Sequence, residues 1–177
     1  QRGAALTQQI LAFSRKQVLD MKPVNLHDIV RNLEKMLHRL VREDIDIQYH
    51  LAPEDLVIFA DISQIDQILI NLATNARDAM PGGGRLGIAT EAFVMDRDYI
   101  EMHGYGNPGE YAVMTIADTG SGMDADTRAH IFEPFFTTKP QGVGSGLGLA
   151  SVHGTVVQNG GSVQLESEPG KGTTVRL

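Results

Sequence analysis

The sequence contains no cysteine and no tryptophan, and none of its apolar runs is long enough to cross a bilayer. Without cysteine, the chain forms no disulfide and no thiolate zinc site, and it has no cysteine nucleophile. A membrane-spanning helix needs about 20 consecutive apolar residues, and a signal peptide needs a basic start followed by an apolar core. The sequence has neither, and we expect a cytoplasmic location for this domain, whether or not its parent protein carries membrane segments elsewhere.

Basic residues are also few, with 15 Lys and Arg against 22 Asp and Glu and a formal net charge of −7. Nucleic-acid surfaces bind phosphates through clustered basic side chains, whereas the basic residues here are scattered, so we expect no nucleic-acid partner. The 177 residues are 42% hydrophobic, which is enough for the core of one compact domain. The sequence starts at Gln1 without an initiator Met, and we expect it to be an excised part of a longer protein.

Periodic apolar residues predict a mixture of helices and strands. The polar, glycine-containing stretch from Asp96 to Gly109 is expected to be an excursion at the sheet edge. Five helices are expected: one that ends near Met21, one over 26–41 with Asn25 as its N-cap, one from Asp61 or Ser63 to Pro81, and two shorter ones near 124–131 and 147–158. The expected strands are 45–51, 56–60, 86–94, 110–117, 162–167 and 172–177.

Three amide side chains share one face of the long predicted helix. Gln67, Asn71 and Asn75 are four residues apart, which makes them neighbours on a helix surface. A carboxamide oxygen is a hard neutral ligand that suits a Mg²⁺ ion bridged by substrate phosphates. The alternative is a polar stripe whose side chains bond to each other or to backbone groups. Taken alone, the spacing favours the polar stripe.

A carboxylate precedes a glycine-rich turn at the end of a predicted strand. Asp118 directly follows the apolar run 113–117, and Gly120 and Gly122 come next. A ligand can approach the backbone closely at such a turn, because glycine has no side chain. The alternative is an ordinary turn in which Asp118 is bonded to its own backbone.

A second glycine run opens the helix that is predicted near 147–158. Gly142, Gly144, Gly146 and Gly148 recur at every second position. So many glycines weaken local structure, while the free N–H groups and the dipole of a helix N-terminus favour an anion. We therefore interpret the run as a phosphate-covering lid in preference to a plain loop.

The motifs follow one another in a fixed order: the amides Asn71 and Asn75, the Asp118 turn, the Phe-rich stretch 132–136 and the glycine run 142–148. This order closely resembles the catalytic ATP-binding domain of sensor histidine kinases, which are members of the GHKL ATPase superfamily. The resemblance covers about residues 22–177, and residues 170–174 are similar to the last strand turn of the family.

The resemblance implies a two-layer α/β sandwich of the α+β kind, the Bergerat fold, in which helices cover one face of a mixed, mainly antiparallel sheet. Residues 1–21 resemble the end of the second helix of the dimerisation and histidine-phosphotransfer hairpin. Residues 22–177 resemble the catalytic domain, with a mobile ATP lid at about 134–146. The full-length protein is expected to be a homodimer, and this fragment, with only a remnant of the hairpin, is expected to dimerise weakly or to be monomeric.

The resemblance also implies a role for each motif residue, with ATP and Mg²⁺ as the bound cofactors. Asn75 binds Mg²⁺ with support from Asn71, so these are the implied catalytic residues. Asp118 accepts a hydrogen bond from the adenine amino group, and Thr173 completes this contact through water. The other implied positions are Gly120 and Gly122 beside the base, the lid anchors Phe132, Phe135 and Phe136, and the backbone N–H groups of Gly144, Gly146, Leu147 and Gly148 at the phosphates.

The chain departs from the family pattern in two places. Many members have a Lys three residues after the Mg²⁺-binding Asn, where this chain has Asp78 beside Arg77. The cation that meets the γ-phosphate is therefore open, and Lys139 in the lid is a candidate. The helix that carries the phosphoacceptor His is also expected to precede this sequence. His27 resembles an acceptor locally, but it follows the hairpin segment that the acceptor precedes, so we expect an ordinary exposed histidine.

The resemblance predicts a protein-histidine kinase domain that transfers the γ-phosphoryl group of Mg²⁺-ATP to a histidine hairpin of its parent protein, for relay to the receiver domain of a response regulator. The fragment alone is not expected to phosphorylate itself. One alternative is an ATP-hydrolysing GHKL enzyme, but those relatives use a Glu to activate water where this chain has Asn71, which is no base near neutral pH. The other is a regulatory nucleotide-binding module that transfers nothing.

Overall fold

The computed structural model describes residues 19–103, 106–140 and 144–177. Most of the predicted N-terminal helix, and Gly142 of the glycine run, lie outside these ranges. The elements in chain order are β1 (Lys22–Asn25), α2 (Leu26–Leu40), β2 (Ile45–His50), β3 (Val57–Ala60), α3 (Ile62–Ala79), β4 (Gly84–Met95), α4 (Arg97–His103), β5 (Gly109–Asp118), α5 (Ala125–His130), α6 (Gly148–Gln158), β6 (Gln164–Glu168) and β7 (Gly172–Arg176).

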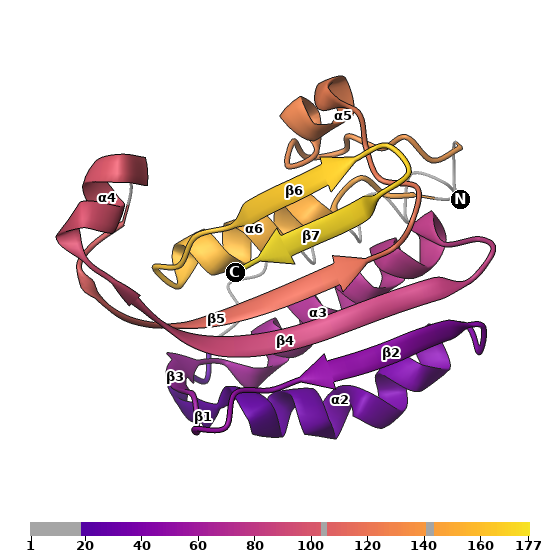
Figure 1. The fold of residues 1–177 in the computed structure, drawn as a ribbon. Helices are drawn as coiled ribbons and strands as arrows, with labels where there is room; N and C mark the ends of the chain where they lie inside the picture. The colour runs from indigo at the N-terminus through magenta and orange to yellow at the C-terminus, as the bar shows by residue number, and fades with distance from the viewer. Residues whose placement is uncertain (1–18, 104–105, 141–143) are drawn as a thin grey trace.

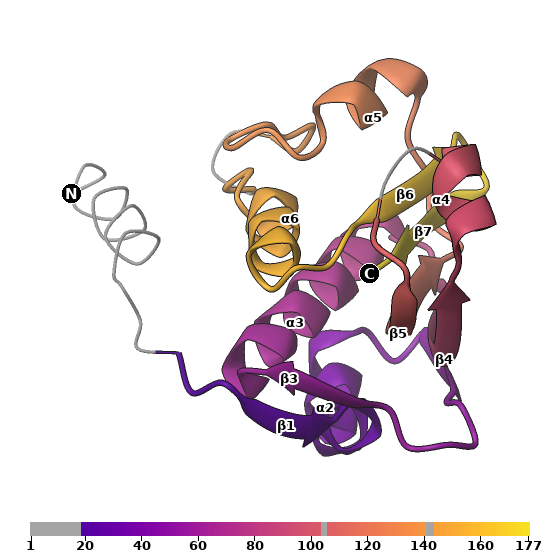
Figure 2. The same ribbon diagram turned by 90° about the vertical axis from the view of Figure 1, so that its left-hand side faces the viewer.

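Five strands form one sheet in the order β2-β4-β5-β7-β6. The β2–β4 pair is parallel, and the other neighbouring pairs are antiparallel. Helices α2, α3 and α6 lie together on one face of this sheet (Figures 1 and 2). The predicted fold class, a mixed and mainly antiparallel sheet with a helical layer, is therefore confirmed.

A second, two-stranded sheet joins β1 and β3 in antiparallel register, with Lys22 opposite Ala60 and Asn25 opposite Val57. β3 was predicted, but β1 was not. Its four residues are too few to show an alternating pattern, and its partner strand is more than thirty residues further along the chain. The pair closes one end of the helical layer (Figure 2).

Side-chain caps fix the first turns of the two long helices. The Oδ1 atom of Asn25 accepts a hydrogen bond from the His27 N–H at 3.0 Å at the start of α2. At the start of α3, Asp61 is the cap, since its Oδ1 accepts from the Ser63 N–H at 2.8 Å and from the Ser63 hydroxyl at 2.6 Å. Such caps satisfy N–H groups that have no partner within the helix.

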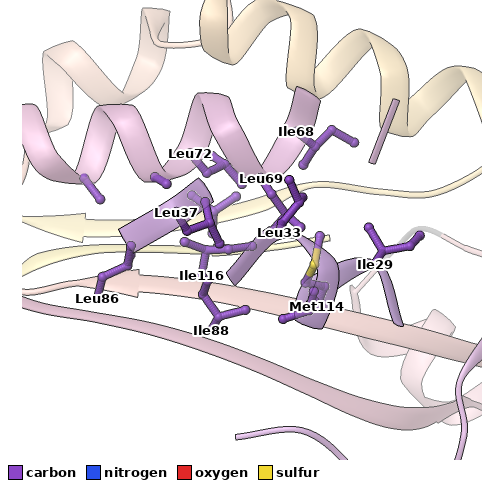
Figure 3. Close-up of a cluster of buried hydrophobic side chains, with 14 of the residues drawn as sticks. Ile29, Leu33, Leu37, Ile68, Leu69, Leu72, Leu86, Ile88, Met114 and Ile116 are labelled. Carbon is purple, nitrogen blue, oxygen red and sulfur yellow. The ribbon is translucent and has the colours of Figure 1, made fainter. Parts of the chain in front are cut away.

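The main core lies between the helical layer and the sheet (Figure 3). Alternate residues of a strand point to the same face of the sheet. The buried apolar residues of β4 and β5 point to the face that the helices cover. Each large aliphatic side chain that is fully buried contributes about 1.5–3 kcal/mol. The labelled core residues are Ile29, Leu33 and Leu37 of α2, Ile68, Leu69 and Leu72 of α3, Leu86 and Ile88 of β4, and Met114 and Ile116 of β5.

Replacing Leu69 with alanine is expected to lower the free energy of unfolding by about 2–5 kcal/mol, because truncation of a buried leucine leaves a cavity. Leu69 is 1% exposed. Urea denaturation followed by circular dichroism measures the change. Val157→Ala is the control, because Val157 of α6 is 52% exposed and its truncation should cost no more than about 0.5 kcal/mol. Equal losses in the two variants would contradict the place of Leu69 in the core.

Two sequence predictions are wrong. The stretch from Asp96 to Gly109 connects the paired strands β4 and β5 and contains α4 (Figure 1). Because β4 and β5 are inner strands of the sheet, the stretch does not flank an edge strand. His27 is not exposed but buried, and its Nε2 lies 2.9 Å from the Thr90 hydroxyl of β4. The first turn of α2 faces the sheet, so a polar side chain there needs a partner.

The described helices include none that is both long and apolar enough to cross a membrane.

Candidate functional site

All the predicted site residues except Gly120 and Leu147 line two adjoining cavities beside α3. The first, of about 210 Å³, reaches from Asp118 and Thr173 to Asn75 and Lys139. The second, of about 280 Å³, shares Asn75, Asp78 and Lys139 with the first and continues along the glycine run. Asp118 at the end of its strand and Asn75 on α3 therefore line the same cavity, although they are far apart in the sequence.

Asp118 ends β5, opposite Thr173 of β7. Its Oδ1 accepts hydrogen bonds from the Gly120 N–H at 2.8 Å and from the Thr173 N–H at 3.3 Å. Within the described residues, Oδ2 has no hydrogen-bond partner. Burial raises the pKa of the Asp118 carboxyl, although the two N–H groups oppose the rise. Asp118 thus bonds to its own turn and still offers one oxygen to a ligand, so the two interpretations of this motif are compatible.

Gly120 and Gly122 are required by contacts within the protein. A Cβ at Gly120 would lie 2.7 Å from the carbonyl oxygen of Ala79 at the end of α3. Gly122 has a φ of 64°, and a Cβ there would overlap the carbonyl oxygen of Glu168. These glycines let the turn after β5 pack between α3 and β6, and this packing positions Asp118 at the cavity.

The amide stripe of α3 faces the N-terminus of α6. Gln67 donates to the Asn71 Oδ1 at 3.1 Å, and Asn71 donates to the Gly148 carbonyl at 3.4 Å. A Cβ at Gly148 would lie 3.7 Å from the Asn75 Nδ2. Asn71 is therefore committed to bonds within the protein. The Asn75 Oδ1 accepts a hydrogen bond from Lys139 Nζ, and both of these residues line both cavities.

A lysine from the segment after α5 reaches into the site. Lys139 Nζ lies 2.6 Å from Asp78 Oδ2 and 3.5 Å from Asn75 Oδ1. Arg77 pairs with the other oxygen of Asp78 at 2.6 Å. Burial alone raises the pKa of the Asp78 carboxyl, but the hydrogen bonds from Lys139 and Arg77 outweigh it and lower the pKa below its usual value. Asp78 is thus held ionised between two cations.

The described part of the glycine run joins the Phe-rich stretch to α6. The Phe135 N–H donates to the Gly146 carbonyl at 2.9 Å, and both residues have positive φ angles, 69° for Phe135 and 67° for Gly146. Gly144 packs against Lys139 and the Thr137 hydroxyl. Leu147 is the N-cap of α6 and makes no side-chain capping bond. The first N–H groups of α6 are therefore available to an anion.

The aromatic residues of this stretch pack against histidines. Phe132 lies 5.0 Å from His153 of α6 and Phe136 lies 5.7 Å from His130 of α5, measured between ring centroids. Phe135 is 54% exposed. The two ring contacts connect the stretch to its flanking helices, and none of the described residues that line the cavity near Asp118 is a phenylalanine or tyrosine.

The side chains present fit a metal ion only together with a substrate. Among the described residues, no group of three or more His, Asp or Glu side chains could hold a metal ion. The Asn75 oxygen is one hard neutral ligand. Mg²⁺ commonly keeps several waters and is held by one or two protein oxygens plus substrate phosphates. The donor set therefore suits Mg²⁺ that arrives with a polyphosphate.

Two features of the site have no counterpart in the sequence predictions. Asp78 and Lys139 were each singled out, but their pairing was not, because it depends on how the segment after α5 folds back over α3. Ser167 was not singled out at all. It is a buried polar residue on β6 that contacts Thr173, and an alternating strand pattern gives no signal for such a bond.

The chain is similar in sequence to known signalling proteins. The family profile of the "Histidine kinase-, DNA gyrase B-, and HSP90-like ATPase" matches residues 60–177. "Sensor kinase CckA" from Brucella abortus (strain 2308) is 42% identical over 177 residues, which are 99% of this chain and 19% of that protein. The chain thus spans about a fifth of the length of this curated relative.

Solved structures agree. The mycobacterial sensor histidine kinase MprB is 28% identical with a TM-score of 0.67, and the match covers 88% of this chain and 94% of that chain. Full-length ShkA, solved in complex with AMPPNP, is 30% identical with a TM-score of 0.66, over 89% of this chain and 30% of that chain.

Proposed function

Because the chain belongs to the family of histidine kinase-, DNA gyrase B- and HSP90-like ATPases, as a catalytic domain of the sensor histidine kinase type, we propose that it binds ATP with Mg²⁺ and transfers the γ-phosphoryl group to a histidine of its parent protein. The observation that supports this most is that Asp118 and Thr173 share one cavity with Asn75 and Lys139. This cavity would connect the proposed base-recognition end to the proposed phosphate end.

The transfer needs no nucleophile from this chain. An unprotonated imidazole nitrogen of the acceptor attacks the γ-phosphorus, and the bond from phosphorus to the bridging oxygen of the β-phosphate breaks. ADP leaves with the electron pair of that bond, and the proton on the other ring nitrogen is released. Such reactions are accelerated mainly by positioning and by neutralisation of phosphate charge. The proposed task of this chain is therefore to orient the nucleotide.

At the base end, Asp118 Oδ2 accepts from the adenine amino group, and Thr173 completes the contact through water. Ile116, Met123 and Leu165 supply apolar walls of the cavity for the base. At the phosphate end, Asn75 would hold Mg²⁺ with Asn71 in support, and the ion would supply positive charge to the phosphate oxygens. Lys139 meets the γ-phosphate, and the backbone N–H groups of Gly144, Gly146, Leu147 and Gly148 bind the phosphates.

Gly146→Ala is expected to weaken ATP binding about tenfold, because a positive φ costs an L-residue roughly 1–2 kcal/mol. The new Cβ would also lie 2.6 Å from the Phe135 Cα. Titration with a fluorescent ATP analogue measures the change. Gly154→Ala is the matched control, since a Cβ at Gly154 in α6 meets no atom within 4 Å. Equal affinities for the two variants would argue against a role of this turn in binding.

Among the described residues, none near Asn75 is suited to activate water for the hydrolase alternative. Asn71 occupies the position of the Glu in the hydrolytic relatives, and an amide is no base near neutral pH. Of the described residues, Asp78 is the one carboxylate that lines both cavities, but two cations keep its pKa low. A carboxylate with a low pKa is a weak general base. We therefore propose slow hydrolysis by this chain in the absence of an acceptor.

For the parent protein, we propose the organisation of a sensor kinase. Residues 1–21 would end the dimerisation and phosphotransfer hairpin, and residues 22–177 would form the catalytic domain, with the ATP lid at about 134–146. The hairpin histidine would pass its phosphoryl group to the receiver domain of a response regulator. The homodimer would form through the complete hairpin, and not through this domain.

The test is phosphoryl transfer from γ-labelled ATP and Mg²⁺ to a separately supplied histidine hairpin of the parent protein. Acid-labile label on the hairpin is expected with the wild-type chain and not with Asn75→Ala, while both chains should unfold at similar temperatures. Steady phosphate release without label would favour the hydrolase. ATP binding with neither product would favour a regulatory module that transfers nothing.

A further inference from the structure

A buried serine on β6 contacts Thr173 of the proposed adenine site from the neighbouring strand. Ser167 of β6 is 5% exposed. Its Oγ lies 2.9 Å from the Gly172 carbonyl, 2.9 Å from the Met123 nitrogen and 3.0 Å from the Thr173 Oγ1. The three contacts saturate this hydroxyl group, which has one proton to donate and two lone pairs to accept.

The direction of each bond follows from the chemistry of the partners. The Gly172 carbonyl can only accept, so the single Ser167 proton must point to it. The Met123 N–H can only donate, and it occupies one lone pair of Ser167. The third contact must therefore run from the Thr173 hydroxyl to Ser167. With this assignment, each of the three short contacts has a proton between its two heavy atoms. If Ser167 instead donated to Thr173, no proton would lie between the Ser167 Oγ and the Gly172 carbonyl oxygen.

A hydroxyl has only one proton, and the Thr173 hydroxyl donates its proton to Ser167. Toward the cavity, Thr173 can therefore present lone pairs but no donor. Its cross-strand neighbour Asp118 also presents an acceptor, the Oδ2 atom. At the base end, two acceptors thus lie next to each other, one charged and one neutral.

Building on the proposed function, we propose that Ser167 is a positioning residue that sets the base selectivity of the site. By holding Thr173 as an acceptor, it favours purines with a 6-amino donor, as in ATP, over purines with a 6-oxo acceptor, as in ITP and GTP. A 6-oxo group facing two acceptors, directly or through a water that they orient, leaves polar groups unpaired in a buried site. Discrimination therefore depends on a residue that itself does not line the cavity.

Ser167→Ala is expected to lower the ratio of the ITP to the ATP dissociation constant by about tenfold. Without Ser167, the Thr173 hydroxyl can turn and donate toward a 6-oxo group, so most of the change should be tighter ITP binding. Displacement of a fluorescent ATP analogue by ATP and by ITP measures the ratio. Ser167→Thr keeps the hydroxyl and should keep the wild-type ratio.

A double-mutant cycle separates this role from a structural one, because Ser167→Ala also removes the partner of the Met123 N–H. In a Thr173→Val background, which has no hydroxyl to orient, Ser167→Ala is expected to leave the ratio unchanged. If Ser167→Ala alters the ratio equally with Thr173 or with valine at that position, or in neither background, the proposal is wrong. Ser167→Cys, which preserves volume but weakens the hydrogen bonds, provides the same comparison should the alanine variant unfold.

The assay distinguishes this proposal from the proposed function. ATP binding with unaltered selectivity in Ser167→Ala would overturn the role of Ser167 and leave the kinase proposal standing. Failure of the wild-type chain to bind either nucleotide would overturn both.

Discussion

Asp118→Asn is expected to weaken ATP binding by roughly 100-fold, since it removes a charge-assisted hydrogen bond and replaces an acceptor by a donor. The asparagine oxygen can still accept from the Gly120 and Thr173 N–H groups, which the Asp118 Oδ1 binds at 2.8 and 3.3 Å. The asparagine Nδ2 would then take the place of Oδ2 and face the adenine amino group, so that two donors meet. The turn should keep its shape while recognition is lost.

The same substitution is expected to maintain or raise the stability of the nucleotide-free protein at neutral pH. Burial raises the pKa of the Asp118 carboxyl above 3.8, its value without the fold. The folded state therefore binds this proton more tightly than the unfolded state does. The contribution of the group to stability is fully present below pH 3.8 and is lost as the pH rises through the higher folded value. The asparagine side chain carries no charge, so its desolvation cost is smaller.

The ATP affinity of the wild type should rise with pH, whereas the contribution of Asp118 to stability falls with pH. The ionised carboxylate is the better acceptor, so affinity falls as the pH is lowered through the raised pKa of Asp118. The acid limb should begin at a higher pH than an ordinary aspartate would give, and it should be absent in Asp118→Asn. Nucleotide titrations at several pH values, with thermal melts alongside, test both effects.

Asp46→Asn is the matched control for this change. Asp46 lies exposed on β2, at the edge of the sheet away from β7. Asp46→Asn is the same chemical change at a residue that lines neither cavity. The ATP affinity of this variant, and the pH dependence of that affinity, should be those of the wild type. Comparable losses in the two variants would remove Asp118 from the proposed base site.

The sequence was sufficient to predict the elements that show their own periodicity. α2 and α3 have long apolar stripes and polar N-caps, and β2 alternates between apolar and polar residues, so each could be placed from local pattern. α4 has no apolar stripe. Its one signal is Asp96, whose Oδ1 accepts from the Tyr99 N–H at 2.8 Å, an N-terminal hydrogen bond of the kind that marks helix starts.

Within the site, sequence could predict positions at element ends but not bonds between distant elements. Asp118 ends a strand and Gly148 begins a helix, and both facts are visible in the order of apolar and glycine residues. The bond from Ser167 to Thr173 and the pairing of Asp78 with Lys139 join residues through the tertiary fold. For the same reason the burial of His27 was missed, since its partner Thr90 is 63 residues away.

Lys139→Ala is expected to lower the rate of phosphoryl transfer by about 100- to 1000-fold, while ATP affinity falls only several-fold. A fixed positive charge beside the γ-phosphate counts most when negative charge is redistributed in the transition state. Among the described residues, Lys139 is the one cation that lines both cavities, with Nζ 3.5 Å from the Asn75 oxygen. Its loss should therefore appear mainly in the transfer rate.

Lys35→Ala is the control, because Lys35 is exposed on α2 and its loss changes the net charge equally. Single-turnover transfer to the hairpin at saturating Mg²⁺-ATP measures the rate apart from binding. Equal rates for Lys139→Ala and the control would assign the γ-phosphate to another cation, and Arg77, which lines the second cavity, would be the next to replace.

Asp78→Asn removes a restraint on Lys139, whose Nζ lies 2.6 Å from Asp78 Oδ2. The pair is partly exposed, with 31% of the Lys139 side chain and 27% of the Asp78 side chain accessible, so it is a weak restraint of the kind that contributes up to about 1 kcal/mol. Replacing the carboxylate by an amide frees the ammonium group, and ATP should bind up to about fivefold more tightly with a transfer rate near that of the wild type. A transfer rate as low as that of Lys139→Ala would instead mean that Asp78 itself takes part, as a ligand for Mg²⁺ or as the group that orients Lys139 in the bound state.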